Sequence, residues 1–183
     1  MKEEQLITEI KENPGQFRLV YDEHYQKIFN YCFKRTKDFD ASKDIASETF
    51  LKAFININKF RWKGVSLQSW LYRIATNEIN LHYRSKKYRP TLLTEIGNSQ
   101  PVISKQSDLL KEKEDAEHEM ERHKEFNKVQ EEITKLPIKY QEVITLKYFE
   151  QLKIKEISNI LDKPEGTIKS LLSRGLNLLK QQL

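Results

Sequence analysis

Apolar residues recur every three or four positions along almost the whole chain, and this spacing limits the fold more than any other feature. It is the spacing of amphipathic helices, whereas half-buried strands show strict alternation of apolar and polar residues. Only five glycines and five prolines interrupt 183 residues, so few points exist at which a helix must break. The sequence therefore predicts an all-α protein.

The first part of the chain is predicted to form one helical bundle. A short charged helix ends near Asn13-Pro14-Gly15, and a second helix follows from about Phe17. Asp40 is the predicted cap of a third helix, and residues 66–88 supply a fourth. Residues 1–89 are therefore expected to form the first domain.

The composition changes at Pro90, where serines, a glycine and a further proline precede a charged stretch. Residues 105–125 hold eight acids and five bases, a local net charge of −3. We expect residues 90–125 to be a flexible, partly helical and solvated linker. His118 and His123 are five residues apart and share no helix face well, so no metal site is predicted.

A second domain is expected over residues 126–183. Two short apolar-striped segments are separated by Asp162-Lys163-Pro164, which is the pattern of a helix-turn-helix. The second of these helices would read DNA. Its predicted outer face carries Thr167, Lys169, Ser170, Ser173 and Arg174.

Composition also narrows the class of protein. Cys32 is the only cysteine, which excludes an intrachain disulfide and a multi-cysteine metal site and favours a reducing compartment. No run of about 18 apolar residues occurs, so a cytoplasmic protein is expected. The net charge of +5 and the pI of about 9.1 favour a polyanionic partner. No cofactor is predicted.

The most cationic segment is residues 61–89, with seven bases and one acid, Glu78. A helix over residues 66–88 is roughly 35 Å long, which lets one end pack in a core while the other lies along phosphates. Asn77, Asn80 and Arg84 recur at helical spacing, and amide and guanidinium groups are the side chains that read base edges. Nearby aromatic rings can stack on unpaired bases, so opened DNA is the expected ligand. These rings are Phe60, Trp62, Tyr72 and Tyr83, of which Tyr72 and Tyr83 fit a core role equally well, whereas Trp70 is expected in the core.

Three stretches in order carry a resemblance to a known family: SKDIASETFLKAF over residues 42–54, SWLYRIATNEINLHYR over residues 69–84, and the segment over residues 136–175. The chain resembles the sigma-70 family of bacterial transcription initiation factors, in the small extracytoplasmic-function group that keeps only regions 2 and 4. The likeness spans nearly the whole chain outside the linker. It implies a promoter specificity factor that depends on core RNA polymerase and has no catalysis of its own.

The resemblance also implies roles for particular residues. The first domain would dock on the polymerase β′ coiled coil and the second on the β flap, and an anti-sigma factor, often membrane-bound, would hold both. The expected polymerase contacts are Asp44, Ser47, Glu48 and Phe50. Recognition and opening of the minus-ten element, with one base flipped into a pocket, would fall to Phe60, Arg61, Trp62, Lys63, Asn77, Asn80 and Arg84, joined on grounds of charge and aromaticity by Tyr83, Lys86 and Lys87. The minus-thirty-five element would be read by Lys163, Glu165, Thr167, Lys169, Ser170, Ser173 and Arg174.

The chain departs from the family pattern at four positions. Ser47 stands where glutamine is common, Leu81 where an acid is common, Gln151 where glycine is common and Leu171 where arginine is common. The change at Leu171 removes an expected DNA contact. Phosphate contacts are therefore predicted for Lys169 and Arg174, and base contacts for Glu165 with Ser170 or Ser173.

Two other functions fit parts of the pattern. A stand-alone helix-turn-helix regulator with an effector-binding first domain would bind duplex DNA tightly without polymerase. A nucleic-acid enzyme would use Asp44 and Glu48 as metal ligands, but no third acid groups with them. For the specificity factor, a flexible linker of about 35 residues fixes no spacing by itself. Polymerase would therefore position the two domains, and the free protein is expected to bind DNA poorly.

Overall fold

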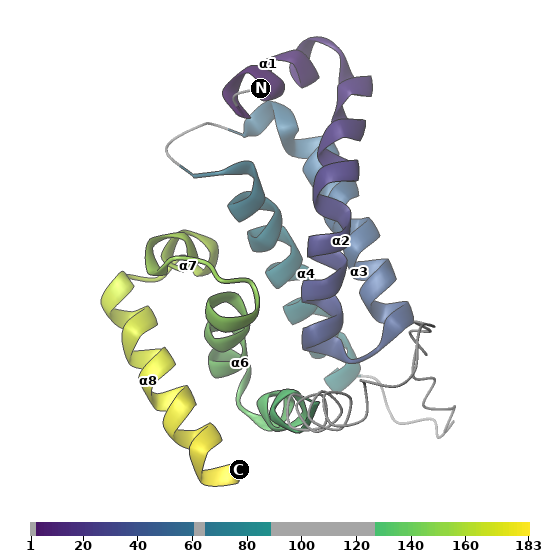
Figure 1. Ribbon diagram of the computed structural model, residues 1–183. Helices are drawn as coiled ribbons and strands as arrows, with labels where there is room; N and C mark the ends of the chain where they lie inside the picture. The colour runs from purple at the N-terminus through teal and green to yellow at the C-terminus, as the bar shows by residue number, and fades with distance from the viewer. Residues whose placement is uncertain (1–2, 61–64, 89–126) are drawn as a thin grey trace, which may run out of the picture.

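The computed structural model describes residues 3–60, 65–88 and 127–183, and within them it contains helices and no strand (Figure 1). The all-α prediction is confirmed, and the helices form two domains. The first contains α1 (Glu3–Glu12), η1 (Pro14–Gln16), α2 (Phe17–Thr36), α3 (Phe39–Asn56), η2 (Ile57–Lys59) and α4 (Leu67–Tyr88). The second contains a helix over residues 127–135, then α6 (Ile138–Ile144), the π-helical η3 (Thr145–Phe149), α7 (Ile154–Leu161) and α8 (Glu165–Gln182).

The N-cap of α3 differs from the predicted one. Asp38 caps the helix in place of Asp40, because its backbone is extended and its Oδ1 accepts a hydrogen bond of 3.0 Å from the Ala41 amide. The helix begins early because α2 ends at once with Lys37 in the left-handed region, at φ 55°. Asp40 then lies in the first turn of α3, where its negative charge interacts favourably with the helix dipole.

The core of the first domain is built where α2 meets α4. The rings of Tyr31 and Tyr72 pack edge to face at 5.2 Å, and the Tyr31 hydroxyl lies 2.8 Å from the Thr76 hydroxyl. Cys32 is fully buried beside them, and burial raises the pKa of its thiol to about 12. The cysteine is therefore a small core residue that stays protonated and unreactive at neutral pH.

The second domain depends on a close approach of α8 to α6. A Cβ atom added to Gly175 would lie 3.0 Å from Ile144 Cδ1 and 3.1 Å from Tyr140 Cβ, so a larger residue would push the helices apart. The predicted helix-turn-helix is present in α7 and α8. Its turn is held by Asp162 at φ 53° and by a 2.6 Å hydrogen bond from the Ser158 hydroxyl to the Lys163 carbonyl.

Tyr148 follows Tyr140, Val143 and Ile144 at helical spacing, yet it is 54% exposed whereas the other three residues are buried. The reason is the π-helical geometry of η3, which inserts an extra residue in the turn and rotates the following side chains off the α-helical face.

The two domains pack directly on each other, as Figure 1 shows for α6 and α7 beside α4. Helix α4 contacts α7, and α2 contacts η3. The buried apolar residues of both domains form one connected cluster. The second domain thus covers one side of α4.

The backbone of Gln151 is strained. This exposed residue has φ 55° in the turn before α7, and this left-handed conformation costs a residue with a side chain about 1–2 kcal/mol. Because glycine adopts this conformation freely but loses more chain entropy, Gln151→Gly should raise the free energy of unfolding by about 0.5–1 kcal/mol. Urea denaturation followed by far-ultraviolet circular dichroism measures this. The control Gln151→Ala keeps the strain and should give no gain; equal stabilisation by both would contradict the explanation.

Candidate nucleic-acid interface

A cavity of about 360 Å³ lies between α3 and α4. Its lining combines aromatic rings, amides and cations, which together suit a flat ligand that carries hydrogen-bonding edges and a negative charge. Asn77 is exposed at the cavity, as the sequence predicted for a DNA-contacting residue. The lining residues are Lys52, Asn56, Lys59, Phe60, Trp70, Ile74, Asn77 and Glu78.

The aromatic wall of the cavity is fixed by the end of η2. Phe60 is 6% exposed, and its ring centroid lies 4.9 Å from that of Trp70. Its amide donates to the Ile57 carbonyl at 3.1 Å, and its carbonyl accepts from Lys11 Nζ at 3.3 Å. Phe60 was predicted to contact DNA. Its ring is almost fully buried, lines the cavity and packs against Trp70, so it supports the shape of the cavity.

A salt bridge network sets the charge of the cavity. Lys52 Nζ lies 2.7 Å from Glu78 Oε2 and 3.3 Å from Glu48 Oε1, which ties α3 to α4. The hydrogen bond to Glu78 raises the pKa of Lys52, so the ammonium stays charged. Glu78 is the one acid between residues 61 and 89, and Lys52 neutralises it. Lys52 and Asn56 were not among the residues predicted from the sequence, although their spacing from Glu48 places all three on one face of α3.

The predicted DNA-contacting residues of α4 do not all face the same way. Asn77 and Arg84 are exposed. Asn80 instead turns to the second domain, where its Nδ2 donates to Glu142 Oε1 at 2.8 Å. Tyr72 and Tyr83 differ in burial. Tyr72 is a buried core residue, whereas Tyr83 is half-buried and its hydroxyl donates to the Arg35 carbonyl. Arg61, Trp62 and Lys63, and the side chains of Lys86 and Lys87, lie outside the described part of the chain.

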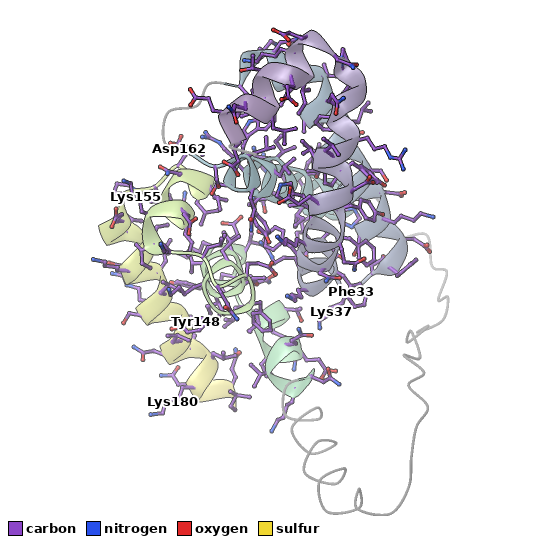
Figure 2. All side chains as sticks on the ribbon, turned by 45° about the horizontal axis from the view of Figure 1, so that its top comes forward. Phe33, Lys37, Tyr148, Lys155, Asp162 and Lys180 are labelled. Carbon is purple, nitrogen blue, oxygen red and sulfur yellow. The ribbon has the colours of Figure 1, made fainter. Side chains whose placement is uncertain are left out.

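The predicted reading face of α8 is open to solvent. Ile168, Leu172 and Gly175 are buried on the opposite face, so the polar residues have no role in packing the domain. Leu171 is half-buried against the core, which accounts for the apolar residue at this position. Figure 2 marks Asp162 in the turn before the helix and Lys180 near its far end. Lys163 is half-buried, and the exposed residues are Glu165, Thr167, Lys169, Ser170, Ser173 and Arg174.

Besides the cavity and the exposed face of α8, the predicted polymerase contacts form a surface along α3. Asp44 and Ser47 are exposed and Glu48 is partly exposed, in line with a docking surface. Phe50 is a correction: it is 3% exposed and packs on Tyr21 at 5.0 Å between ring centroids, because it belongs to the core stripe of the helix. Two exposed apolar residues, which were not predicted from the sequence, continue the acidic face at helical spacing. These are Leu51, 52% exposed, and Ile55, 64% exposed.

The residues that the structure describes contain no group of three or more histidine, cysteine, aspartate or glutamate residues arranged to hold a metal ion. None of their helices is both long and apolar enough to cross a membrane.

Each of the two domains matches a known protein family. Residues 20–89 match the sequence model of Sigma-70 region 2, and residues 126–179 match that of Sigma-70 region 4. The chain is 34% identical over 181 residues to the ECF RNA polymerase sigma factor SigW of Bacillus subtilis (strain 168), covering 97% of this chain and 94% of that protein. It is 31% identical over 165 residues to the RNA polymerase sigma factor YlaC of the same organism, covering 90% of each.

Two solved structures share the fold. One is CnrH in complex with the cytosolic domain of CnrY, with a TM-score of 0.68 and 17% identity over 98% of this chain and 96% of that chain. The other is the sigma factor RpoE in complex with the anti-sigma factor NepR from Bartonella quintana, with a TM-score of 0.64 and 18% identity over 90% of this chain and 94% of that chain.

The buried position of Phe60 predicts a loss of stability on truncation. Phe60→Ala should lower the free energy of unfolding of the first domain by about 3–5 kcal/mol, because it removes a buried ring and leaves a cavity beside Trp70. Both tryptophans lie in this domain, so urea unfolding followed by tryptophan fluorescence measures the change. The matched control is Phe54→Ala, at a ring that is 42% exposed, and a smaller loss is expected there. Equal losses in the free energy of unfolding for the two variants would contradict a structural role for the buried Phe60 ring.

Proposed function

Because this chain belongs to the extracytoplasmic-function group of sigma-70 RNA polymerase sigma factors, we propose that it opens the minus-ten element with its first domain and reads the minus-thirty-five element with α8. The observation that carries the proposal is the cavity between α3 and α4, which opens beside the exposed polar face of a cationic helix. The chain acts through binding alone and has no catalytic step of its own. Its working parts are the domain of residues 1–89, the linker of residues 90–125 and the domain of residues 126–183.

The cavity is proposed to hold one base flipped out of the non-template strand. Extruding a base costs a few kcal/mol of stacking, which a pocket offsets by stacking and by hydrogen bonds to the base edge. Trp70 and Ile74 supply the apolar wall, and the amides of Asn56 and Asn77 supply donors and acceptors. Arg84, two turns after Asn77 on the exposed side of α4, is placed to bind the strand phosphates.

Helix α8 is proposed to enter the major groove with its first turns. Lys169 and Arg174 would contact phosphates, while Glu165 with Ser170 or Ser173 would contact base edges. Gly166 supports this orientation: a Cβ atom added there would meet nothing within 4 Å, so packing inside the chain does not explain the glycine. A bare first turn lets the helix backbone approach DNA closely.

The face of α3 formed by Asp44, Ser47, Glu48, Leu51 and Ile55 is proposed to bind the β′ coiled coil, and the second domain the β flap. Exposed leucine and isoleucine beside acids suit a partner that is apolar at the centre and basic at the rim. We also propose that an anti-sigma factor regulates this chain in the cytoplasm, since sigma factors of the same fold have been solved with such partners.

The proposal is tested by run-off transcription with core polymerase on genomic fragments, with and without this protein. Transcripts that start only when the protein is present support it; repression, or duplex binding without polymerase, would instead indicate the stand-alone regulator.

The same assay tests the cavity. Asn77→Ala should lower run-off transcription about tenfold, the value of one lost base contact of about 1–3 kcal/mol. The matched control is Asn30→Ala, at an exposed asparagine on α2 that should leave transcription unchanged. On a promoter whose minus-ten element is pre-opened by mismatches, the defect should shrink but persist if Asn77 contacts the base. Full activity of Asn77→Ala on the closed promoter would contradict the assignment.

A second prediction concerns the phosphate contacts of α8. Lys169→Ala should weaken binding of the holoenzyme to promoter DNA about equally for different minus-thirty-five sequences, and should reduce the slope of log affinity against log salt by about 1. Binding measured across a salt series checks this. Lys180→Ala, at the far end of the same helix, is the control and should leave the slope unchanged (Figure 2). An unchanged slope for Lys169→Ala would remove this residue from the DNA interface.

A further inference from the structure

Helix α1 lies at the end of the first domain where α3 ends and α4 begins, as Figure 1 shows. Its apolar residues Leu6, Ile7 and Ile10 are buried in the core, and the helix contacts η2. The match to Sigma-70 region 2 begins at residue 20, after α1 has ended at Glu12. That match therefore assigns no role to α1, whereas the contacts of its polar residues indicate one.

Two polar residues of α1 bind backbone groups at the end of η2 and at the start of α4. Lys11 Nζ donates to the Phe60 carbonyl at 3.3 Å. Glu3 Oε2 accepts from the amide of Leu67, the first residue of α4, at 3.5 Å. Both hydrogen bonds are partly buried, and each joins segments that are far apart in the sequence. We call these two hydrogen bonds the α1 contacts.

The start of α4 has backbone donors that need an acceptor from outside the helix, because the first four amides of any helix have no partner within it. The Ser66 hydroxyl accepts from the Ser69 amide at 3.1 Å, and the Ser66 carbonyl accepts from the Trp70 amide at 3.1 Å, as a helix cap does. The Leu67 amide takes its acceptor from α1, through Glu3. A carboxylate at this end of α4 also interacts favourably with the helix dipole.

The α1 contacts adjoin the aromatic wall of the proposed base pocket, which is formed by the rings of Phe60 and Trp70. Both rings line the cavity between α3 and α4, with 4.9 Å between their centroids. Lys11 binds the backbone of Phe60 itself, and Glu3 binds α4 at Leu67, within one turn of Trp70. Each ring of the aromatic wall is therefore attached to a stretch of backbone that α1 holds.

From this geometry we propose that Lys11 and Glu3 are positioning residues for the minus-ten element: through the α1 contacts they fix the aromatic wall of the cavity, and thereby its selectivity for the flipped base. Neither side chain lines the cavity, so both act through Phe60 and Trp70. This inference rests on the proposed function and adds to it a helix outside the residues that match region 2.

Selectivity should depend on the position of the aromatic wall more than total binding does. A pocket distinguishes bases by hydrogen bonds to the base edge, while the base stacks on its wall. A wall that shifts moves the base relative to the amides of Asn56 and Asn77. Hydrogen bonds weaken steeply with misalignment, whereas stacking tolerates any base. Loss of an α1 contact is therefore expected to reduce discrimination between bases first.

Run-off transcription by the holoenzyme on two promoters tests the inference. The promoters differ by one base pair in the minus-ten element, chosen as the change that most lowers transcription by the wild-type protein. Lys11→Ala should lower the ratio of transcription from the two promoters about three- to tenfold, because one hydrogen bond to the wall is lost. Lys11→Arg keeps a donor for the Phe60 carbonyl and should restore most of the ratio. Lys27→Ala, at an exposed lysine of α2, is the control and should leave the ratio unchanged.

This ratio separates positioning from a general loss of structure. A smaller fraction of folded protein lowers transcription from both promoters alike and leaves their ratio unchanged. The buried apolar residues of α1 should keep the helix on the core in Lys11→Ala, so its far-ultraviolet circular dichroism should match that of the wild type. A wild-type ratio for Lys11→Ala would overturn the inference, whatever the total amount of transcript.

Hydrogen exchange of the Leu67 amide, measured by nuclear magnetic resonance on the free chain, tests the second α1 contact. Glu3→Ala should speed this exchange about threefold or more, because the amide loses its acceptor. Glu4→Ala, at the exposed neighbouring acid, is the control and should have little effect. Equal exchange in both variants and the wild type would overturn the inference. If exchange changes as expected but the wild-type chain supports no transcription with core polymerase, the proposed function fails while the α1 contacts stand.

Discussion

The hydrogen bond from Tyr72 to Glu150 joins the interior of one domain to the surface of the other. The Tyr72 ring packs against Tyr31 in the core of the first domain, while its hydroxyl reaches the carboxylate that Lys34 also binds. Burial, and then the charge of Glu150, raise the pKa of Tyr72, so the phenol remains a neutral donor. One side chain therefore contributes both to the stability of the bundle and to the position of the second domain.

Much of the fold follows from helical periodicity. The spacing of apolar residues predicted an all-α chain and the helix-turn-helix, because both depend mainly on local sequence. The cap of α3 was wrong by two residues, since the left-handed residue Lys37 ends α2 in a way that propensity does not reveal. The exposed Tyr148 had a similar cause in the π-helical turn.

Less of the candidate site could be predicted from the sequence. Periodicity shows that a residue lies on a polar face, but not which neighbour that face meets. Asn77 and Asn80 are three positions apart, yet Asn77 is exposed at the cavity, whereas Asn80 donates to Glu142 of the second domain. The family resemblance assigned Phe50 to a polymerase contact, and the same resemblance together with its aromatic ring assigned Phe60 to a DNA contact, although both rings are almost fully buried. Lys52 was missed because its partner, Glu78, is on a different helix.

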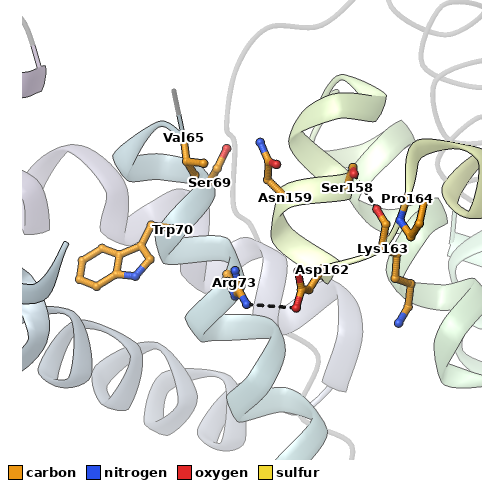
Figure 3. A pocket seen from close by; sticks show the side chains of 9 residues that line it. All are labelled: Val65, Ser69, Trp70, Arg73, Ser158, Asn159, Asp162, Lys163 and Pro164. Carbon is orange, nitrogen blue, oxygen red and sulfur yellow. Dashed lines mark hydrogen bonds and ion pairs between the residues drawn. The ribbon is translucent and has the colours of Figure 1, made fainter. Parts of the chain in front are cut away.

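Trp70 connects the two sides of α4. It lines the cavity that faces Asn77 and also the cavity between α4 and the turn before α8, and Figure 3 shows its indole turned away from Asp162. Residues 70, 74 and 77 form one face of the helix at three-and-four spacing, and residues 69, 73 and 80 form the next. Because one indole forms part of the wall of both cavities, a substitution at Trp70 would change the shape of both at once.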